Sequence, residues 1–175
     1  GLASVQVFMS DERLVPTASN DSNHGTMLRL WPDVSCGQLF LPDMAHSEES
    51  MASHYEAQMV GILGELPSFD CVMLGLGEDG HTASLFPGKP SLTAINLICL
   101  ADHGQLPPPV KRLTFTYRLI NHARNVVVIA AGAKKRPWIE ALLAGNSDTS
   151  TFPLSGVNPH GKLWIVLDRA AWPEA

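Results

Sequence analysis

Phe69–Gly88, FDCVMLGLGEDGHTASLFPG, is the stretch that decides the fold. Its apolar run Cys71–Leu74 is typical of a buried strand. A short helical turn is expected to begin at residues 82–84. Three glycines stand between the strand and that turn, and they indicate a tight loop: Gly75, Gly77 and Gly80. The stretch therefore predicts a strand, a tight loop and a short helix.

Two residues of this loop carry the chemistry. In open parallel sheets the loops that leave the carboxyl ends of strands form the ligand crevice, so Asp79 and His81 are expected to lie there. An imidazole titrates near neutral pH, which makes His81 the candidate general base, and a nearby carboxylate can orient its ring. The alternative is a histidine that only caps local backbone. The other histidines lack the spacing of a zinc site, so we expect no metal ion.

Strand and helix patterns alternate along the rest of the chain. They predict an α/β fold, a single open, mostly parallel sheet with helices on both faces, in one domain that spans residues 1–175. The clearest helix begins near Ser47, where Glu48 and Glu49 complement the helix dipole, and Pro67 ends it. The other expected elements are strands at 4–9, 92–100, 112–116, 125–131 and 163–167, and helices at 22–28 and 134–144.

Composition narrows the class of protein. The 175 residues have a net charge of −5 and include no apolar run long enough to span a membrane, so we expect neither a broad nucleic-acid surface nor a membrane partner. Cys36, Cys71 and Cys99 lie far apart, and the last two sit in apolar runs that predict buried thiols. A reducing, cytoplasmic compartment is the simplest interpretation. The oligomeric state is left open.

Two cations are candidates for binding an anion. Arg13 follows the first expected strand and can bind a phosphate or a carboxylate, or else pair with Asp11 or Glu12. Lys135 is expected in the first turn of a helix, where a cation is unfavourable unless an anion binds, although an exposed lysine costs little there. The three glycines do not make a dinucleotide fingerprint, because no acidic ribose partner follows. Ser84 has no nucleophile elbow around it, so capping or packing is expected.

Six motifs together resemble the 6-phosphogluconolactonase family, which is related to the glucosamine-6-phosphate deaminases. They occur in family order from the first strand to the last. The motifs are SDERLVP (10–16), DSN (21–23), LGLGEDGHTASLFPG (74–88), KRLTFT (111–116), GAKK (132–135) and PLSGVNPHG (153–161).

The resemblance implies a Rossmann-like fold of the sugar-phosphate isomerase/lactonase type. It also implies hydrolysis of 6-phospho-D-glucono-1,5-lactone to 6-phosphogluconate in the pentose phosphate pathway, without a cofactor or a required metal. His81 would activate water, and Asp79 would orient His81 or a sugar hydroxyl. The remaining residues that the resemblance assigns to substrate binding are Asp11, Arg13, Asn23, Gly80, Arg112 and Lys135. How the phosphate and the developing charge are divided among the three cations is left open.

The same motifs separate two branches of the family. The deaminases resemble DGHIAFNEPG and DEY, whereas this chain has DGHTASLFPG at 79–88 and DER at 11–13. The lactonase branch is therefore favoured. Two alternatives remain, a non-catalytic remnant that binds sugar phosphates and a glucosamine-6-phosphate deaminase/isomerase.

One family feature is missing from the printed sequence. The family begins with a further strand–loop–helix unit that carries a glycine-rich phosphate loop, and here the first strand precedes Asp11. The resemblance therefore implies that the chain is N-terminally truncated relative to the family. Either the region has been lost from this chain, or the protein is a divergent short form. A complete chain without this unit would expose a sheet edge and bind substrate more weakly, and that edge would offer a surface for dimerisation.

Overall fold

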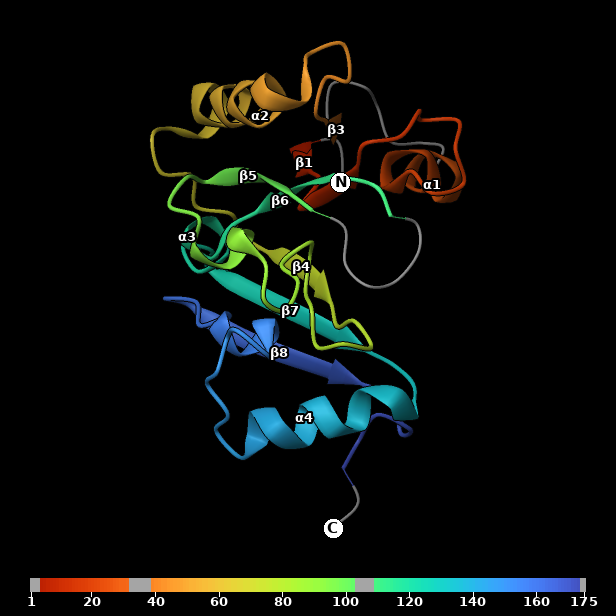
Figure 1. The fold of residues 1–175 in the computed structure, drawn as a ribbon. Helices are drawn as coiled ribbons and strands as arrows, with labels where there is room; N and C mark the ends of the chain where they lie inside the picture. The colour runs from red at the N-terminus through yellow and green to blue at the C-terminus, as the bar shows by residue number, and fades with distance from the viewer. Residues whose placement is uncertain (1–3, 32–38, 103–108, 174–175) are drawn as a thin grey trace.

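The computed structural model describes residues 4–31, 39–102 and 109–173 (Figure 1). Its strands are β1 Val7–Phe8, β2 Asp11–Arg13, β3 Leu39–Phe40, β4 Val72–Gly75, β5 Ile98–Ala101, β6 Arg112–Phe115, β7 Asn125–Ala130 and β8 Lys162–Leu167. Its α-helices are α1 Asn23–Leu30, α2 Glu48–Leu63, α3 Tyr117–Ile120 and α4 Arg136–Leu143. Three 3₁₀ helices join them: η2 Pro90–Thr93, η3 Ala133–Lys135 and η4 Pro153–Gly156.

The described strands form three sheets. β1 pairs with β3 and β4–β7–β8 forms a second sheet, both parallel, whereas β2–β6–β5 is antiparallel. The α/β class and the parallel character of the main sheet are thus confirmed, but the strands do not form one continuous ladder. Between β1 and β4 lies a largely apolar cavity of about 500 Å³, lined from both sides by residues such as Phe8, Phe69 and Met73. In the described residues, the edge of β4 that faces this cavity has no strand partner.

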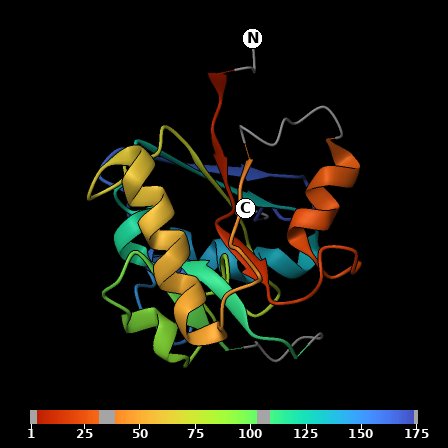
Figure 2. The same ribbon diagram turned by 90° about the horizontal axis from the view of Figure 1, so that it is seen from above.

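Helices lie at both ends of the layered structure. Figure 1 shows α2 above β5 and β6 and α4 below β8, and Figure 2 shows α1 and α2 on opposite sides of the β1–β3 pair. Ser47 and the acidic first turn start α2 as expected, and its buried face consists of Met51, Tyr55 and Met59. Tyr55 and Met59 join a core cluster that extends to η4. This packing holds the loop after β4 against β6.

One face of the β4–β7–β8 sheet is open. Strand side chains alternate between the two faces, and the outward set is apolar and exposed: Met73 at 63%, Ile129 at 45%, Trp164 at 51% and Val166 at 50%. In β7 the inward side chains Val126 and Val128 are buried completely. One face of this sheet and, in the described residues, one edge of β4 therefore lie open.

Several local expectations were wrong. Residues 82–84 form no helix, because Thr82 and Leu85 make an isolated antiparallel bridge and the Ala83 backbone is left-handed at φ 47°. The strand expected at 92–100 is confined to β5, and η2 replaces its first part because Pro90 favours a helical start.

Burial also differed from expectation at three places. Cys71 is exposed, since it lies on the open side of β4, whereas Cys99 is partly buried. The sequence predicted that residues of β6 alternate between buried and exposed, but all four are buried. They are covered by β2, β5 and the loop after β4. β3, at Leu39–Phe40, is a strand that the sequence did not predict. Cys36 lies outside the described residues. In the part of the chain that the structure describes, no helix is long and apolar enough to cross a membrane.

Candidate active site

A polar cavity of about 310 Å³ forms where β2, β6, the end of β4 and the first turn of α1 meet. Five of the residues singled out from the sequence line it: Asp11, Arg13, Asn23, His81 and Arg112. They come from four motifs far apart in the chain. The fold therefore brings a base candidate, a carboxylate, an amide and two cations to one place.

His81 is held by Asp79. The Asp79 carboxylate bonds to Nδ1 of the imidazole and also accepts the His81 backbone N–H, at 3.2 Å. The other ring nitrogen, Nε2, has no partner among the described residues, and the ring lines the cavity. Burial raises the pKa of the Asp79 carboxyl, but the hydrogen bond and the charge interaction with His81 outweigh it and keep the pKa below its ordinary value. Asp79 is thus ionised at neutral pH and fixes the ring.

The glycine at position 77 is required by the imidazole. A Cβ built on Gly77 would overlap the His81 ring atoms, so the ring packs directly against the Gly77 backbone. The Gly77 N–H donates to the His81 carbonyl oxygen at 2.8 Å, which closes the loop. His81 is therefore confined between a carboxylate and bare backbone.

Gly80 stands behind this loop and is absent from the cavity lining. Its φ is +82°, and a Cβ there would lie 3.0 Å from both Trp138 and Phe152. The indole Nε1 of Trp138 donates to the Glu78 carbonyl at 3.0 Å, and the Leu154 N–H donates to Gly80 at 3.2 Å. Helix α4 and η4 therefore anchor the loop from the side away from the cavity. A direct contact of Gly80 with substrate stays a prediction.

Two arginines face each other across β2 and β6. Arg13 and Arg112 are register partners in this antiparallel pair, an arrangement in which like charges destabilise the sheet. One amino group of Arg13, Nη1, donates to the Asp21 carbonyl at 2.9 Å, so the ion pair with Asp11 or Glu12 considered from the sequence is not the bond observed. The buried Nε atoms of both arginines have no partner among the described residues.

Arg112 is the more isolated of the two. It is 6% exposed, its guanidinium lies 5.2 Å from the centre of the Phe86 ring, and none of its side-chain nitrogens bonds to a described residue. Burial lowers the pKa of its guanidinium, and repulsion from Arg13 adds to this, while Asp11 opposes it. Buried cations are normally paired, so an anion in the cavity would satisfy both arginines.

Asp11 supplies the carboxyl group of the cavity lining, since Asp79 is not part of that lining. Burial raises its pKa above the ordinary value, although a hydrogen bond from Ser84 and the positive charges of Arg112 and Arg13 act in the other direction. The Ser84 hydroxyl donates to Asp11 Oδ2 at 2.8 Å, and the Ser84 N–H donates to Thr114 Oγ1 at 3.0 Å. Ser84 is thus a buried packing residue, as expected, and it positions a carboxyl group.

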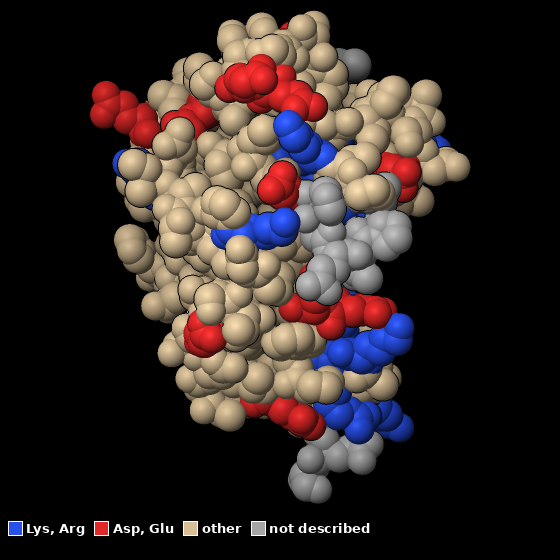
Figure 3. Space-filling model, viewed as in Figure 1, with Lys and Arg blue, Asp and Glu red and all other residues tan. Residues whose placement is uncertain are grey.

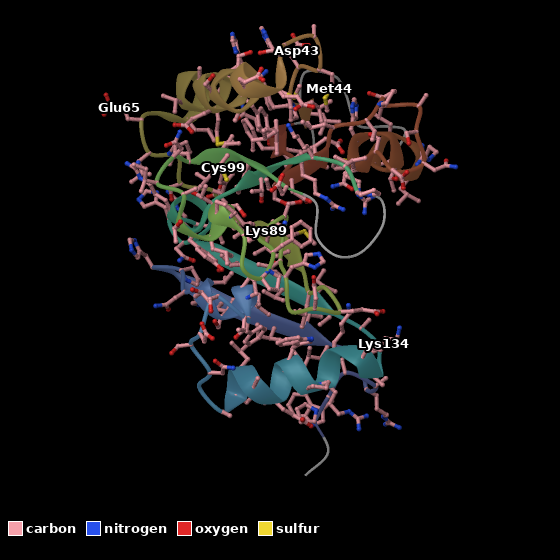
Figure 4. All side chains as sticks on the ribbon, viewed as in Figure 1. Asp43, Met44, Glu65, Lys89, Cys99 and Lys134 are labelled. Atoms are coloured by element: carbon pink, nitrogen blue, oxygen red, sulfur yellow. The ribbon has the colours of Figure 1, made fainter. Side chains whose placement is uncertain are left out.

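Lys135 is outside the cavity lining. It ends η3, which follows β7, and its side chain makes no ion pair or hydrogen bond with a described residue, whereas Lys134 pairs with Glu78 at 3.0 Å. Figure 4 places Lys134 beside the start of α4, and in Figure 3 basic side chains gather at the same end with acidic ones directly above. The phosphate-binding role of Lys135 therefore remains a prediction.

Some cavity residues were missed by the sequence reasoning. Met73, Leu76 and Ala83 line it through backbone or apolar groups, for which no chemical motif exists. Only the structure marks one of them as part of a functional site: Ala83 has a left-handed backbone, and strained residues cluster at such sites. Among residues 4–31, 39–102 and 109–173 there is no group of three or more His, Cys, Asp or Glu side chains that could hold a metal ion.

The site and the fold define the class of protein. Residues 2–165 match the family described as glucosamine-6-phosphate isomerases/6-phosphogluconolactonase, and the chain belongs to this family. Two relatives of the chain are named as 6-phosphogluconolactonases. A 6-phosphogluconolactonase of Synechocystis sp. is 36% identical over 95% of this chain and 72% of its own length, and one of Nostoc sp. is 33% identical over 97% and 73%.

A solved structure agrees with the sequence relatives. The 6-phosphogluconolactonase from Trypanosoma cruzi superimposes with a TM-score of 0.86 at 28% identity, over 95% of this chain and 71% of that one. The resemblance found in the motifs and the lactonase-type fold are thereby confirmed.

Replacing Gly77 with alanine tests the contact between the loop backbone and His81. The added Cβ displaces the ring, and since a misplacement of about 1 Å can cost about a hundredfold, we expect kcat for lactone hydrolysis to fall about 10- to 100-fold with KM changed less than about threefold. Steady-state kinetics measure both. Gly61→Ala is the matched control, because a Cβ there meets nothing within 4 Å. Wild-type kcat in Gly77→Ala would contradict the prediction.

Replacing Arg112 with methionine tests the anion site. We expect the dissociation constant of inorganic phosphate, measured by calorimetry, to rise about tenfold or more, since about 1.4 kcal/mol of charge-assisted bonding is lost. Because the repulsion from Arg13 also disappears, the free energy of unfolding should not fall. Arg124→Met, at an exposed ion pair with Asp70, is the control that should leave phosphate binding unchanged. Undiminished phosphate binding by Arg112→Met would exclude the site.

Proposed function

We propose that this chain hydrolyses 6-phospho-D-glucono-1,5-lactone to 6-phosphogluconate, with His81 as the general base. The observation that supports this most is the presence, in one cavity, of an oriented imidazole and two guanidiniums whose buried Nε atoms have no partner among the described residues. An anionic ester-like substrate requires both kinds of group. The names of the lactonase relatives supply the identity of the substrate.

His81 moves one proton twice in the proposed reaction. Its free Nε2 takes a proton from water as the water oxygen bonds to the lactone carbonyl carbon, and the carbonyl electron pair moves onto the oxygen. When this tetrahedral intermediate collapses, the carbonyl re-forms and the bond to the ring oxygen breaks. The imidazolium then returns the proton to that oxygen, which becomes a hydroxyl group. The product is the open-chain acid, and no cofactor takes part.

Asp79 keeps the imidazole in the productive tautomer. Its carboxylate holds a proton on Nδ1, so Nε2 is left as the acceptor, and it stabilises the imidazolium that forms. The pKa of Asp79, which lies below its ordinary value, keeps the carboxylate charged for this purpose.

The remaining cavity groups bind the substrate. Arg13 and Arg112 hold the phosphate, because two guanidiniums match a dianion and lose their mutual repulsion when it binds. Asp11 and Asn23 hydrogen-bond the sugar hydroxyls, as carboxyl and amide groups facing the same cavity. Lys135 contributes a further cation from the end of β7. Two free cysteines fit the proposed cytoplasmic location.

A second candidate is a domain that binds sugar phosphates without turnover. The open edge of β4 favours it, because Met73 lines both the apolar cavity and the active-site cavity, and no strand of the described residues covers this side of the site. The deaminase alternative has no comparable support in the residues, since the motifs at 11–13 and 79–88 differ from that branch.

Lactone hydrolysis by the purified chain and by Asp79→Asn tests the function. We expect turnover above the spontaneous rate for the wild type and a kcat lower by about a hundredfold or more for the variant, because asparagine favours the wrong tautomer of His81. The variant, purified in the same way, also shows how much of the measured rate comes from a contaminating host enzyme. Binding of 6-phosphogluconate without turnover would support the second candidate instead, and ammonia release from glucosamine 6-phosphate would support the deaminase.

A further inference from the structure

The carboxylate of Glu12 is buried and accepts an unusual set of hydrogen bonds. Its side chain is 1% exposed. Oε1 accepts the backbone N–H of Arg13 at 2.7 Å and of Asn23 at 2.9 Å, while Oε2 accepts the N–H of His24 at 2.7 Å and lies 3.5 Å from the Ser22 hydroxyl. No basic side chain pairs with it among the described residues. Such a group is costly to bury, so its partners explain its presence.

Two of those partners, the N–H groups of Asn23 and His24, are donors at the start of α1. The first N–H groups of a helix have no partner within the helix. In α1 the first two, of Asn23 and His24, bond to Glu12, and the third, of Gly25, bonds to the Ser22 hydroxyl at 2.9 Å. Glu12 therefore completes the helix cap with a negative charge at the positive end of the helix dipole.

The position of Glu12 in β2 connects this cap to the active-site cavity. Side chains alternate along a strand, so Asp11 and Arg13 point to one face and Glu12 to the other. The first two line the cavity, and Glu12 meets α1. Two further bonds join the same elements, from Asn23 Nδ2 to the Asp11 carbonyl at 3.1 Å and from Arg13 Nη1 to the Asp21 carbonyl at 2.9 Å.

We infer that Glu12 is a positioning residue that sets Arg13 and Asn23 for substrate binding by fixing the start of α1 to β2. It touches no substrate itself. Its Oε1 accepts the backbone N–H of both binding residues at once, so neither backbone can shift without breaking a charge-assisted hydrogen bond. The inference rests on the proposed function, since it assigns Glu12 a part in holding the same substrate.

Glu12→Gln tests the inference because an amide keeps the shape but leaves one accepting oxygen instead of two. In one orientation of the amide the NH₂ group faces the N–H groups of Arg13 and Asn23, and in the other it faces the N–H of His24, so either orientation breaks a bond to the start of α1. We expect KM for the lactone, and the dissociation constant of 6-phosphogluconate, to rise about tenfold, while kcat changes less than about threefold, since His81 and Asp79 are untouched. Amide hydrogen exchange at Asn23 and His24 should accelerate in the same variant.

Two controls separate positioning from stability. Glu56→Gln alters a similar carboxylate, which accepts the backbone N–H groups of Leu97 and Ile98 at 3.0 and 3.1 Å far from the cavity lining. Ser22→Ala weakens the cap of α1 but leaves the Glu12 bonds to the N–H groups. Both should lower the thermal midpoint and leave KM unchanged. If Glu12→Gln does not fold, Glu12→Asp, which keeps the charge but shortens the reach, takes its place.

The outcomes distinguish the two proposals. A wild-type chain that neither binds 6-phosphogluconate nor hydrolyses the lactone refutes the proposed function. A working wild type with KM unchanged in Glu12→Gln, or raised equally in Glu56→Gln, refutes the role of Glu12. A KM increase confined to the Glu12 variants, together with faster exchange at Asn23 and His24, is the result we expect.

Discussion

The site depends on the confinement of one imidazole ring. His81 lies between the Asp79 carboxylate, which bonds to Nδ1, and the backbone of Gly77, where no side chain fits. Both contacts arise within five residues, so the loop after β4 forms the base by itself. Trp138 and Phe152 then hold that loop from behind, which links the geometry of the base to the packing of α4 and η4. The rest of the molecule supplies the charges around this ring.

Those charges are arranged at a cost to stability. Arg13 and Arg112 lie opposite each other in β2 and β6, and Arg112 is buried without a hydrogen-bonding partner among the described residues. Asp11, nearby, has a pKa raised by burial. The opposition and burial of the two arginines are unfavourable in the free protein and become favourable with an anionic substrate in place. Glu12 differs, because its bonds are complete without any ligand, as suits a group that holds the binding residues in position.

The sequence predicted the parts of this site that depend on local patterns. The apolar run before Gly75, the spacing of Asp79 and His81 and the periodic Met51–Tyr55–Met59 face each need only neighbouring residues. The turn at 82–84 was wrong because Ser84 bonds to Thr114 and Asp11, partners distant in the chain. The opposition of Arg13 and Arg112 depends on the register of β2 and β6. The role of Glu12 depends on how α1 docks against β2. A local sequence pattern reveals neither. Motif resemblance supplied the substrate.

The most direct test of the account is the rate of lactone hydrolysis by His81→Ala, measured with and without added imidazole. We expect kcat to fall roughly 10²- to 10⁴-fold, because the general base is lost. Added imidazole should restore part of the rate, since it can occupy the space beside Asp79 and Gly77. Circular dichroism establishes that the variant is folded. Turnover by a folded His81→Ala protein at the wild-type rate would contradict the assignment of His81 as the base.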